Sequence, residues 1–87
     1  MTSSWTVYIL HCQDTSFYTG ITNDLPKRIA DHEKGLGAKY TRGRGPFTLV
    51  YQEGFPDRSL ASKREYALKK LSRAAKQQLI EEKGLCA

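Results

Sequence analysis

Two tyrosines and a basic pair are the side chains of this sequence whose types and spacing could do chemistry. Tyr8 and Tyr18 lie in two short apolar runs, and Arg28 and His32 follow at the spacing of one helical turn. A phenol or an imidazole can transfer a proton to or from a reacting group, and a planar guanidinium can offset the charge of a phosphate. Brought together by the fold, these groups indicate phosphodiester chemistry.

An antiparallel hairpin is expected to position the two tyrosines. Segments 5–12 and 17–22 are rich in aromatic and β-branched residues, which favours strands, and the polar stretch 13–16 between them is turn-like. If both phenols act at one site, Tyr8 must lie opposite Gly20, because a register shifted by one residue places Tyr18 on the other face. That register requires a loop with an odd number of residues, or a bulge. Gly20 would then leave space beside the Tyr8 ring.

Signals for three helices and a further strand follow the hairpin. Asn23 or Asp24 can cap the first helix, and Pro26 suits its first turn. The expected elements are a helix ending near Lys34, a glycine-rich loop at 35–46, a strand at 47–53, a helix from Ser59 or Ser62 to about Leu71, and a final helix between Ser72 and Gly84.

One carboxylate, Glu65, is expected at the border of a buried helix face. The helix that carries it has an apolar stripe formed by Leu60, Ala67 and Leu71 and adjoined by Ala61 and Leu68. A charge at this border is costly unless it is paired or binds a metal ion. Lys69 lies one turn later and could pair with Glu65, so an ion pair and a metal site both remain open.

Composition and charge limit the function classes. The 87 residues are expected to form one domain over 1–87, and the net charge of +5 is unevenly spread. Between Lys39 and Arg73, nine Lys and Arg residues stand against three acids, which suits a nucleic-acid partner but also a merely cationic surface. Two distant cysteines give neither a disulfide framework nor a zinc site. Without a signal peptide or an apolar run that could span a bilayer, a cytoplasmic location is expected.

The order of these motifs resembles the GIY-YIG nuclease family, and in particular its small, single-domain bacterial members. The segments T-V-Y at 6–8 and Y-T-G at 18–20 are similar to the two halves of the family motif. Arg28 and His32, the A-K-Y-T-R segment at 38–42, and the helix residue Glu65 extend the resemblance over roughly residues 5–80. It implies an α/β (α+β) domain of order ββαβαα, with a three-stranded antiparallel sheet flanked by about three helices.

The resemblance also implies an activity, the cleavage of DNA with one divalent metal ion, Mg²⁺ or Mn²⁺. On that reading Glu65 holds the metal and Tyr8 is the general base for an attacking water. Arg28 offsets charge in the transition state, and Tyr18 orients phosphate or water. His32 hydrogen-bonds the tyrosine or relays its proton.

The sequence departs from the family pattern at the motif and near its C-terminal end. The strict G-I-Y is T-V-Y here, and Y-I-G is Y-T-G. Many relatives carry a late asparagine, whereas Gln77 and Gln78 are the only amides between Tyr66 and Ala87. A module that binds nucleic acid with weak or no cleavage is therefore the alternative. A third hypothesis, an RNA-binding or ribosome-associated protein, rests on charge alone.

The basic half of the chain is expected to contact nucleic acid. Gly20 would allow a ligand to approach closely, and basic residues interleaved with an aromatic suit a phosphate backbone with some base stacking. Besides Gly20, the candidates are Lys39, Tyr40, Arg42, Arg44, Lys69, Lys70 and Arg73. The DNA could be single-stranded, duplex or branched, and a partner protein could supply sequence specificity.

Overall fold

The computed structural model of the protein describes residues 4–13, 15–35 and 47–83, which form three strands and three helices. The elements are β1 (Trp5–His11), β2 (Phe17–Thr22), α1 (Leu25–Glu33), β3 (Thr48–Phe55), α2 (Arg58–Lys69) and α3 (Arg73–Lys83). This order is the predicted ββαβαα, so the predicted α+β class is confirmed.

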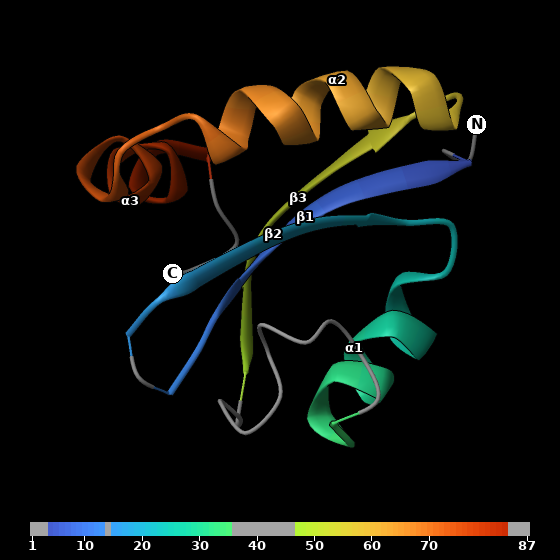
Figure 1. Ribbon diagram of the computed structural model, residues 1–87, viewed down its shortest axis with the longest axis horizontal. Coiled ribbons are helices and arrows are strands. Elements are labelled where there is room, and N and C mark those ends of the chain that lie inside the picture. The colour runs from blue at the N-terminus through green and yellow to red at the C-terminus, as the bar shows by residue number, and fades with distance from the viewer. Residues whose placement is uncertain (1–3, 14, 36–46, 84–87) are drawn as a thin grey trace.

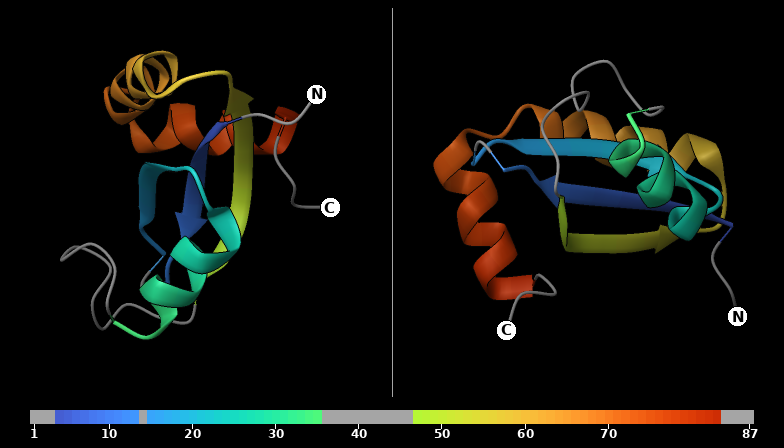
Figure 2. Two further views of the ribbon diagram at one scale, coloured as in Figure 1. Left: turned by 90° about the vertical axis from the view of Figure 1, so that its right-hand side faces the viewer. Right: turned by 90° about the horizontal axis from the view of Figure 1, so that it is seen from below.

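The three strands form one antiparallel sheet in the order β2-β1-β3, with β1 at its centre. Helices α1 and α2 lie on opposite faces of this sheet (Figure 1). Helix α3 runs crosswise to the strands at one end of the sheet (Figure 2). The central strand therefore presents its alternate side chains to two different layers.

The β1–β2 hairpin has the register that a shared tyrosine face requires. Tyr8 lies opposite Gly20. The Cys12 amide donates to the Ser16 carbonyl at 2.8 Å, and the Thr15 amide donates to the Cys12 carbonyl at 3.0 Å. Thr15 has a positive φ of 70°, as is common in three-residue hairpin connections. The predicted odd connection is thus found between the paired residues at 12 and 16.

One face of β1 builds an apolar core with β3, α2 and α3. Its buried members are Val7, Ile9, Val50, Tyr51, Ala61, Leu68 and Ile80. A bulge in β3 contributes to this core, because Ile9 pairs with Tyr51 while Leu10 pairs with Leu49, which leaves Val50 as an extra residue. The other face of β1 is buried by α1 and carries the candidate site.

Several helix and strand ends differ from those predicted. Asp24 caps α1 and Ser72 caps α3, as expected. Helix α2, however, is capped by Asp57 and not by Ser59 or Ser62. The Asp57 carboxylate accepts a hydrogen bond from the Leu60 amide at 2.9 Å. Strand β3 continues through Phe55 because residues 54 and 55 pair with the start of β1. Strand β1 ends one residue earlier than predicted, and α2 ends at 69 instead of near 71.

The apolar stripe predicted for α2 is wrong in its phase. Ala61 and Leu68 are the buried residues of the helix, whereas Leu60 is 41% exposed and Leu71 is 37% exposed. Two residues seven positions apart lie on one line of a helix, so α2 rests on the sheet along a narrow strip. This rotation places Glu65 at one border of the buried strip.

None of the helices in the described ranges has the length and apolar character that crossing a membrane requires.

Candidate active site

The two tyrosines lie side by side on the face of the sheet that α1 covers. Tyr8 projects from the central strand and Tyr18 from the edge strand β2, and their ring centroids are 6.2 Å apart at an interplanar angle of 48°. Tyr8 is fully buried, and Tyr18 is partly exposed. One phenol therefore sits inside the fold, and the other lies between it and the solvent-accessible edge.

Gly20 makes room for this arrangement, as the sequence suggested. A Cβ atom at this position would lie 2.8 Å from the Tyr8 hydroxyl oxygen, 2.9 Å from Tyr8 Cζ and 3.0 Å from Tyr18 Cε2. Real Cβ atoms essentially never approach other atoms below 3.0 Å. A larger residue would have to displace the Tyr8 phenol, so the glycine is needed for the position of that ring.

Helix α1 brings an imidazole against both phenols. His32 Nε2 lies 2.8 Å from the Tyr8 hydroxyl oxygen, and the His32 side chain is buried. The His32 ring also meets the Tyr18 ring edge-on, with centroids 5.1 Å apart. His32 is therefore not a surface histidine, and it is positioned to exchange a proton with Tyr8.

Arg28, one turn before His32, interacts with the same phenols. Its guanidinium hydrogen-bonds to both Tyr8 and Tyr18. The acids on its own helix are engaged elsewhere, since Asp24 caps the helix and Asp31 pairs with Lys27 at 3.3 Å. The structure thus directs Arg28 to the tyrosines and not to a local ion pair.

Burial and charge set the protonation states at this site. Burial is the main cause that raises the pKa of Tyr8 to about 12, and the charges of Tyr18 and Glu65 raise it further, while the Arg28 hydrogen bond and charge oppose the shift. Burial, followed by the charge of Arg28, lowers the pKa of His32 below its usual value. Near neutral pH the site therefore holds a protonated phenol 2.8 Å from a neutral imidazole, whose Nε2 can accept the phenol proton when the ring carries its own proton on Nδ1.

Glu65 lies on α2, on the other side of the sheet from α1. Its carboxylate pairs with Lys69 Nζ at 3.2 Å, its side chain is 22% exposed, and its charge acts on the Tyr8 phenol. Within the described ranges, no group of three His, Cys, Asp or Glu residues is arranged to hold a metal ion. A cation at Glu65 would thus have one protein carboxylate, and this fits Mg²⁺, which commonly keeps waters and binds substrate phosphate.

The residues predicted to contact nucleic acid fall into two groups. Lys39, Tyr40, Arg42 and Arg44 lie outside the described residues. Of the others, Lys70 stacks its ammonium group over the exposed Tyr66 ring, 4.3 Å from the centroid. Arg73 donates to the Thr15 carbonyl and lies 5.0 Å from the Phe17 ring centroid, so it also holds the hairpin in place. Lys69 lines a pocket beside Tyr18.

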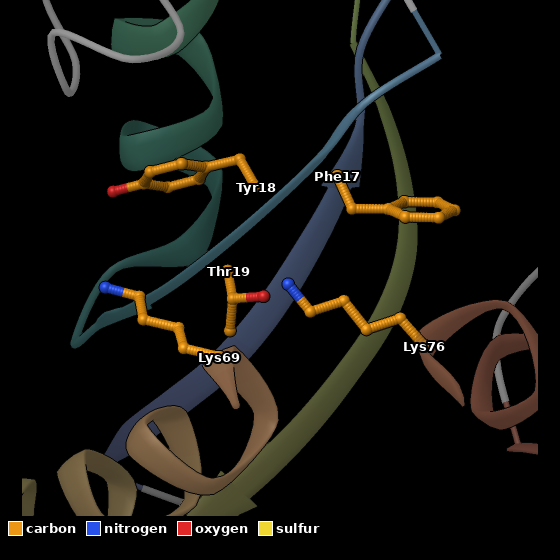
Figure 3. Close-up of a pocket in the computed structure, with 5 residues that line it drawn as sticks. All are labelled: Phe17, Tyr18, Thr19, Lys69 and Lys76. Atoms are coloured by element: carbon orange, nitrogen blue, oxygen red, sulfur yellow. The ribbon is translucent and has the colours of Figure 1, made fainter. Parts of the chain in front are cut away.

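Sequence reasoning missed three neighbours of the site. Phe47, taken as the start of a strand, packs against the His32 ring with centroids 6.0 Å apart. Thr19 and Lys76 line the same pocket as Lys69 (Figure 3). The basic charge of Lys76 could have marked it as a candidate for nucleic-acid binding. It was missed because it lies on a different helix from Lys69, and the turn between α2 and α3 determines whether the two side chains come together.

Comparisons with known proteins give a consistent result. A family model described as the GIY-YIG catalytic domain matches residues 4–78. The UPF0213 protein CPE1444 of Clostridium perfringens is 58% identical over 79 residues, which cover 91% of this chain and 85% of that protein. The solution NMR structure of the UPF0213 protein BH0048 from Bacillus halodurans has a TM-score of 0.62 at 53% identity and covers 93% of this chain and 86% of that one.

A second solved structure, the protein EF2693 from E. faecalis, has a TM-score of 0.58 at 41% identity, over 91% of this chain and 84% of that one. The names of these three proteins state no activity, so the reaction has to be argued from the side chains.

Proposed function

The chain belongs to the GIY-YIG family of nuclease domains, and we propose that it is a metal-dependent endonuclease that hydrolyses phosphodiester bonds of DNA. One observation carries this proposal: the buried Tyr8 hydroxyl lies 2.8 Å from His32 Nε2, and Arg28 hydrogen-bonds to the same phenol. A phenol between a proton acceptor and a fixed cation is suited to take a proton from water next to a phosphate.

In this proposal Tyr8 and His32 move one proton each. As the oxygen of an attacking water forms its bond to phosphorus, the Tyr8 oxygen takes the water's proton and the Tyr8 hydroxyl proton passes to His32 Nε2. The bond between phosphorus and the leaving oxygen then breaks, the electron pair stays on that oxygen, and solvent water protonates it. A phenol with a pKa of about 12 is a poor base by itself at neutral pH, because almost none of it is ionised. The neutral imidazole beside it supplies the acceptor that the phenol needs.

Arg28 and Tyr18 have supporting roles. The guanidinium offers several donors on one plane, which suits the negative charge that develops on the phosphoryl oxygens. Its interactions with both phenols direct the guanidinium toward the two tyrosines. Tyr18 is the more exposed phenol and can orient the phosphate or the water at the entrance to the site.

Glu65 is the residue that would hold the divalent cation. When bound, such an ion supplies Lewis-acid stabilisation of the charge on the phosphate and on the leaving oxygen. The ion pair with Lys69 keeps the carboxylate in place before a cation replaces that partner. Weak binding is expected from a single carboxylate, so the substrate phosphate should increase the affinity for the ion.

A cleavage assay with a matched pair of glutamate variants tests the proposal. Single-stranded, duplex and branched DNA would be incubated with Mg²⁺, Mn²⁺ or EDTA. We expect cleavage that requires the metal and is lost in Glu65→Gln. Glu53→Gln is the control because Glu53 is also an ion-paired glutamate, 3.1 Å from Arg64 Nε, but on edge strand β3. Equal cleavage by the two variants would refute the role of Glu65.

A binding module without cleavage is the second candidate, and the Glu65–Lys69 ion pair favours it, because the carboxylate already has a partner. The same assay separates the two functions. Wild-type protein that binds DNA yet cuts none of the three substrates with either metal would support the binding module and refute the endonuclease.

A further inference from the structure

A pocket at the outer edge of β2 is suited to bind a phosphate group. It has a volume of about 390 Å³ and is lined by Phe17, Tyr18, Thr19, Lys69 and Lys76. Lys69 reaches it from α2 and Lys76 from α3, so the pocket lies where the two helices meet the edge strand (Figure 3). Two ammonium groups and no acid are found among these described lining residues.

Thr19 gives an independent sign that the pocket takes a ligand. Its side chain is buried, at 3% exposure, and among the described residues its Oγ1 has no hydrogen-bond partner. A buried hydroxyl without a partner costs about 1–3 kcal/mol, so its presence in a stable fold calls for an explanation. Figure 3 shows this hydroxyl pointing toward the ammonium end of Lys76 inside the pocket.

Lys76 is held in a position that an anion would stabilise. Burial, and then the nearby charge of Lys69, lowers the pKa of the Lys76 ammonium. Lys69 is 52% exposed and pairs with Glu65 at 3.2 Å, so the repulsion between the two cations acts mainly on the more buried Lys76. An anion between them would remove this repulsion, and the Thr19 hydroxyl could donate to one of its oxygens.

We propose that Thr19, Lys69 and Lys76 bind a backbone phosphate of the proposed nucleic-acid substrate at the edge of β2, and that this phosphate is not the one that is cleaved. The proposal rests on the nucleic-acid substrate of the proposed function. Tyr18 links the two places, because it is among the residues that line this pocket and its ring lies beside Tyr8 in the active site.

A polymeric ligand fits better than a free phosphate ion. A second pocket of about 220 Å³ shares Phe17 and Lys76 with the first and adds Ser16 and Arg73. Cations therefore continue along the edge of β2 beyond a single phosphate site, as a strand with repeated charges requires. A free phosphate ion would occupy only the first pocket.

Two substitutions and a charge-matched control test the proposal. Binding of a labelled single-stranded oligonucleotide would be measured by fluorescence anisotropy in EDTA over a range of salt concentrations, so that no cleavage is needed. We expect Lys76→Gln to weaken binding several-fold and to reduce the slope of log Kd against log salt by about one. Lys63→Gln removes the same charge from an exposed position of α2 and should leave binding nearly unchanged.

Thr19→Val keeps the shape of the side chain and removes only the hydroxyl. We expect it to weaken oligonucleotide binding with no change in the salt slope, and to leave the thermal stability unchanged or raised, because a buried hydroxyl without a partner is lost. A loss of binding together with a loss of stability would point to misfolding and would count against the assignment of Thr19.

The outcomes separate this site from the catalytic proposal. If Lys76→Gln and Lys63→Gln bind DNA equally at every salt concentration, the phosphate site is refuted, even for a protein that cleaves DNA. If wild-type protein cleaves no DNA but Lys76→Gln weakens DNA binding, the phosphate site is supported and the endonuclease proposal is refuted. An NMR titration with inorganic phosphate provides the second arm. Shifts at Thr19 and Lys76 without any effect of Lys76→Gln on DNA binding would assign the pocket to free phosphate and overturn the proposal.

Discussion

The two faces of β1 are equally buried but are built from different chemistry. Val7 and Ile9 point to α2 and α3, while Tyr8 and Leu10 point to α1, and all four residues are fully buried. The α2 side surrounds Ile9 with aliphatic and aromatic carbon. On the α1 side, Tyr8 meets a histidine and a second phenol.

This difference shows how a small domain can keep stability and chemistry apart. Burial of apolar surface stabilises the fold by about 25 cal/mol per Å², so the α2 face contributes most to folding. A buried phenol and imidazole lose hydration, and their mutual hydrogen bond recovers only part of that cost. The α1 face therefore contributes less stability per buried residue, and it holds a perturbed phenol beside a neutral base.

The largest expected effect comes from removing one hydroxyl on the α1 face. Tyr8→Phe should lower the cleavage rate by about 10²–10⁴-fold, the usual contribution of a general base. Tyr51→Phe is the matched control, since Tyr51 is also buried and donates to Glu53 at 2.8 Å, but on the α2 face. We expect it to cost about 0.5–1.5 kcal/mol of unfolding free energy and to leave the cleavage rate unchanged. The test compares the cleavage rate constants of the two variants at saturating DNA and metal. Equal rate constants would contradict the assignment of catalysis to the α1 face and stability to the α2 face.

The neighbour of Tyr8 on the same strand should behave in the opposite way. Ile9→Ala should lower the free energy of unfolding by about 2–5 kcal/mol, because it opens a cavity in the apolar core. Ile9→Val should cost only about 0.5–1.5 kcal/mol. Urea denaturation gives these values, and cleavage should be measured where each variant is folded. A folded Ile9→Ala protein with a rate as low as that of Tyr8→Phe would show that the two faces are not separable.

Sequence patterns predicted most of the α1 face, because Tyr8, Tyr18, Arg28 and His32 are linked by short-range rules, but they missed the contact of Phe47 with His32. Requiring the two tyrosines on one face fixed the pairing of Tyr8 with Gly20, and the spacing of Arg28 and His32 fixed their shared side of α1. Each of these relations spans one hairpin or one helical turn. The roles of these residues in a reaction stay predictions until the variants are measured.

The α2 face could not be predicted as well, for a physical reason. Apolar residues in α2 allow two nearly equivalent stripes, and the contact with the sheet selected the one with Ala61 and Leu68. The pocket of Thr19 and Lys76 depends further on the turn between α2 and α3, and no local pattern specifies the angle of that turn. Tertiary packing, and not propensity, decided both outcomes.

A methyl group at position 20 would test how closely the α1 face is packed. Gly20→Ala places a Cβ atom 2.8 Å from the Tyr8 hydroxyl oxygen, so we expect a loss of about 1–3 kcal/mol in unfolding free energy and a reduced cleavage rate. Combining it with Tyr8→Phe removes the atom nearest to the new methyl group. The double variant should therefore lose less stability than the two single losses added together. Simple additivity in urea denaturation would mean that the glycine does not act through the tyrosine.

The smallest expected effect is a pH dependence of stability that belongs to the α1 face alone. The pKa of His32 is lowered in the folded protein, so as pH falls through about 6.5 the unfolded chain takes up a proton that the folded chain resists. Stability is therefore fully present above this range and declines below it, by at most about 1.4 kcal/mol per pH unit. Thermal unfolding between about pH 7.5 and 5.5 measures the decline, which His32→Gln should abolish and His11→Gln should retain. The cleavage rate should fall only at lower pH, through the lowered pKa of His32 in the folded protein, because a protonated imidazole cannot accept the Tyr8 proton. A wild-type stability that stays flat between about pH 7.5 and 5.5 would contradict the neutral, buried His32 on which the proton path depends.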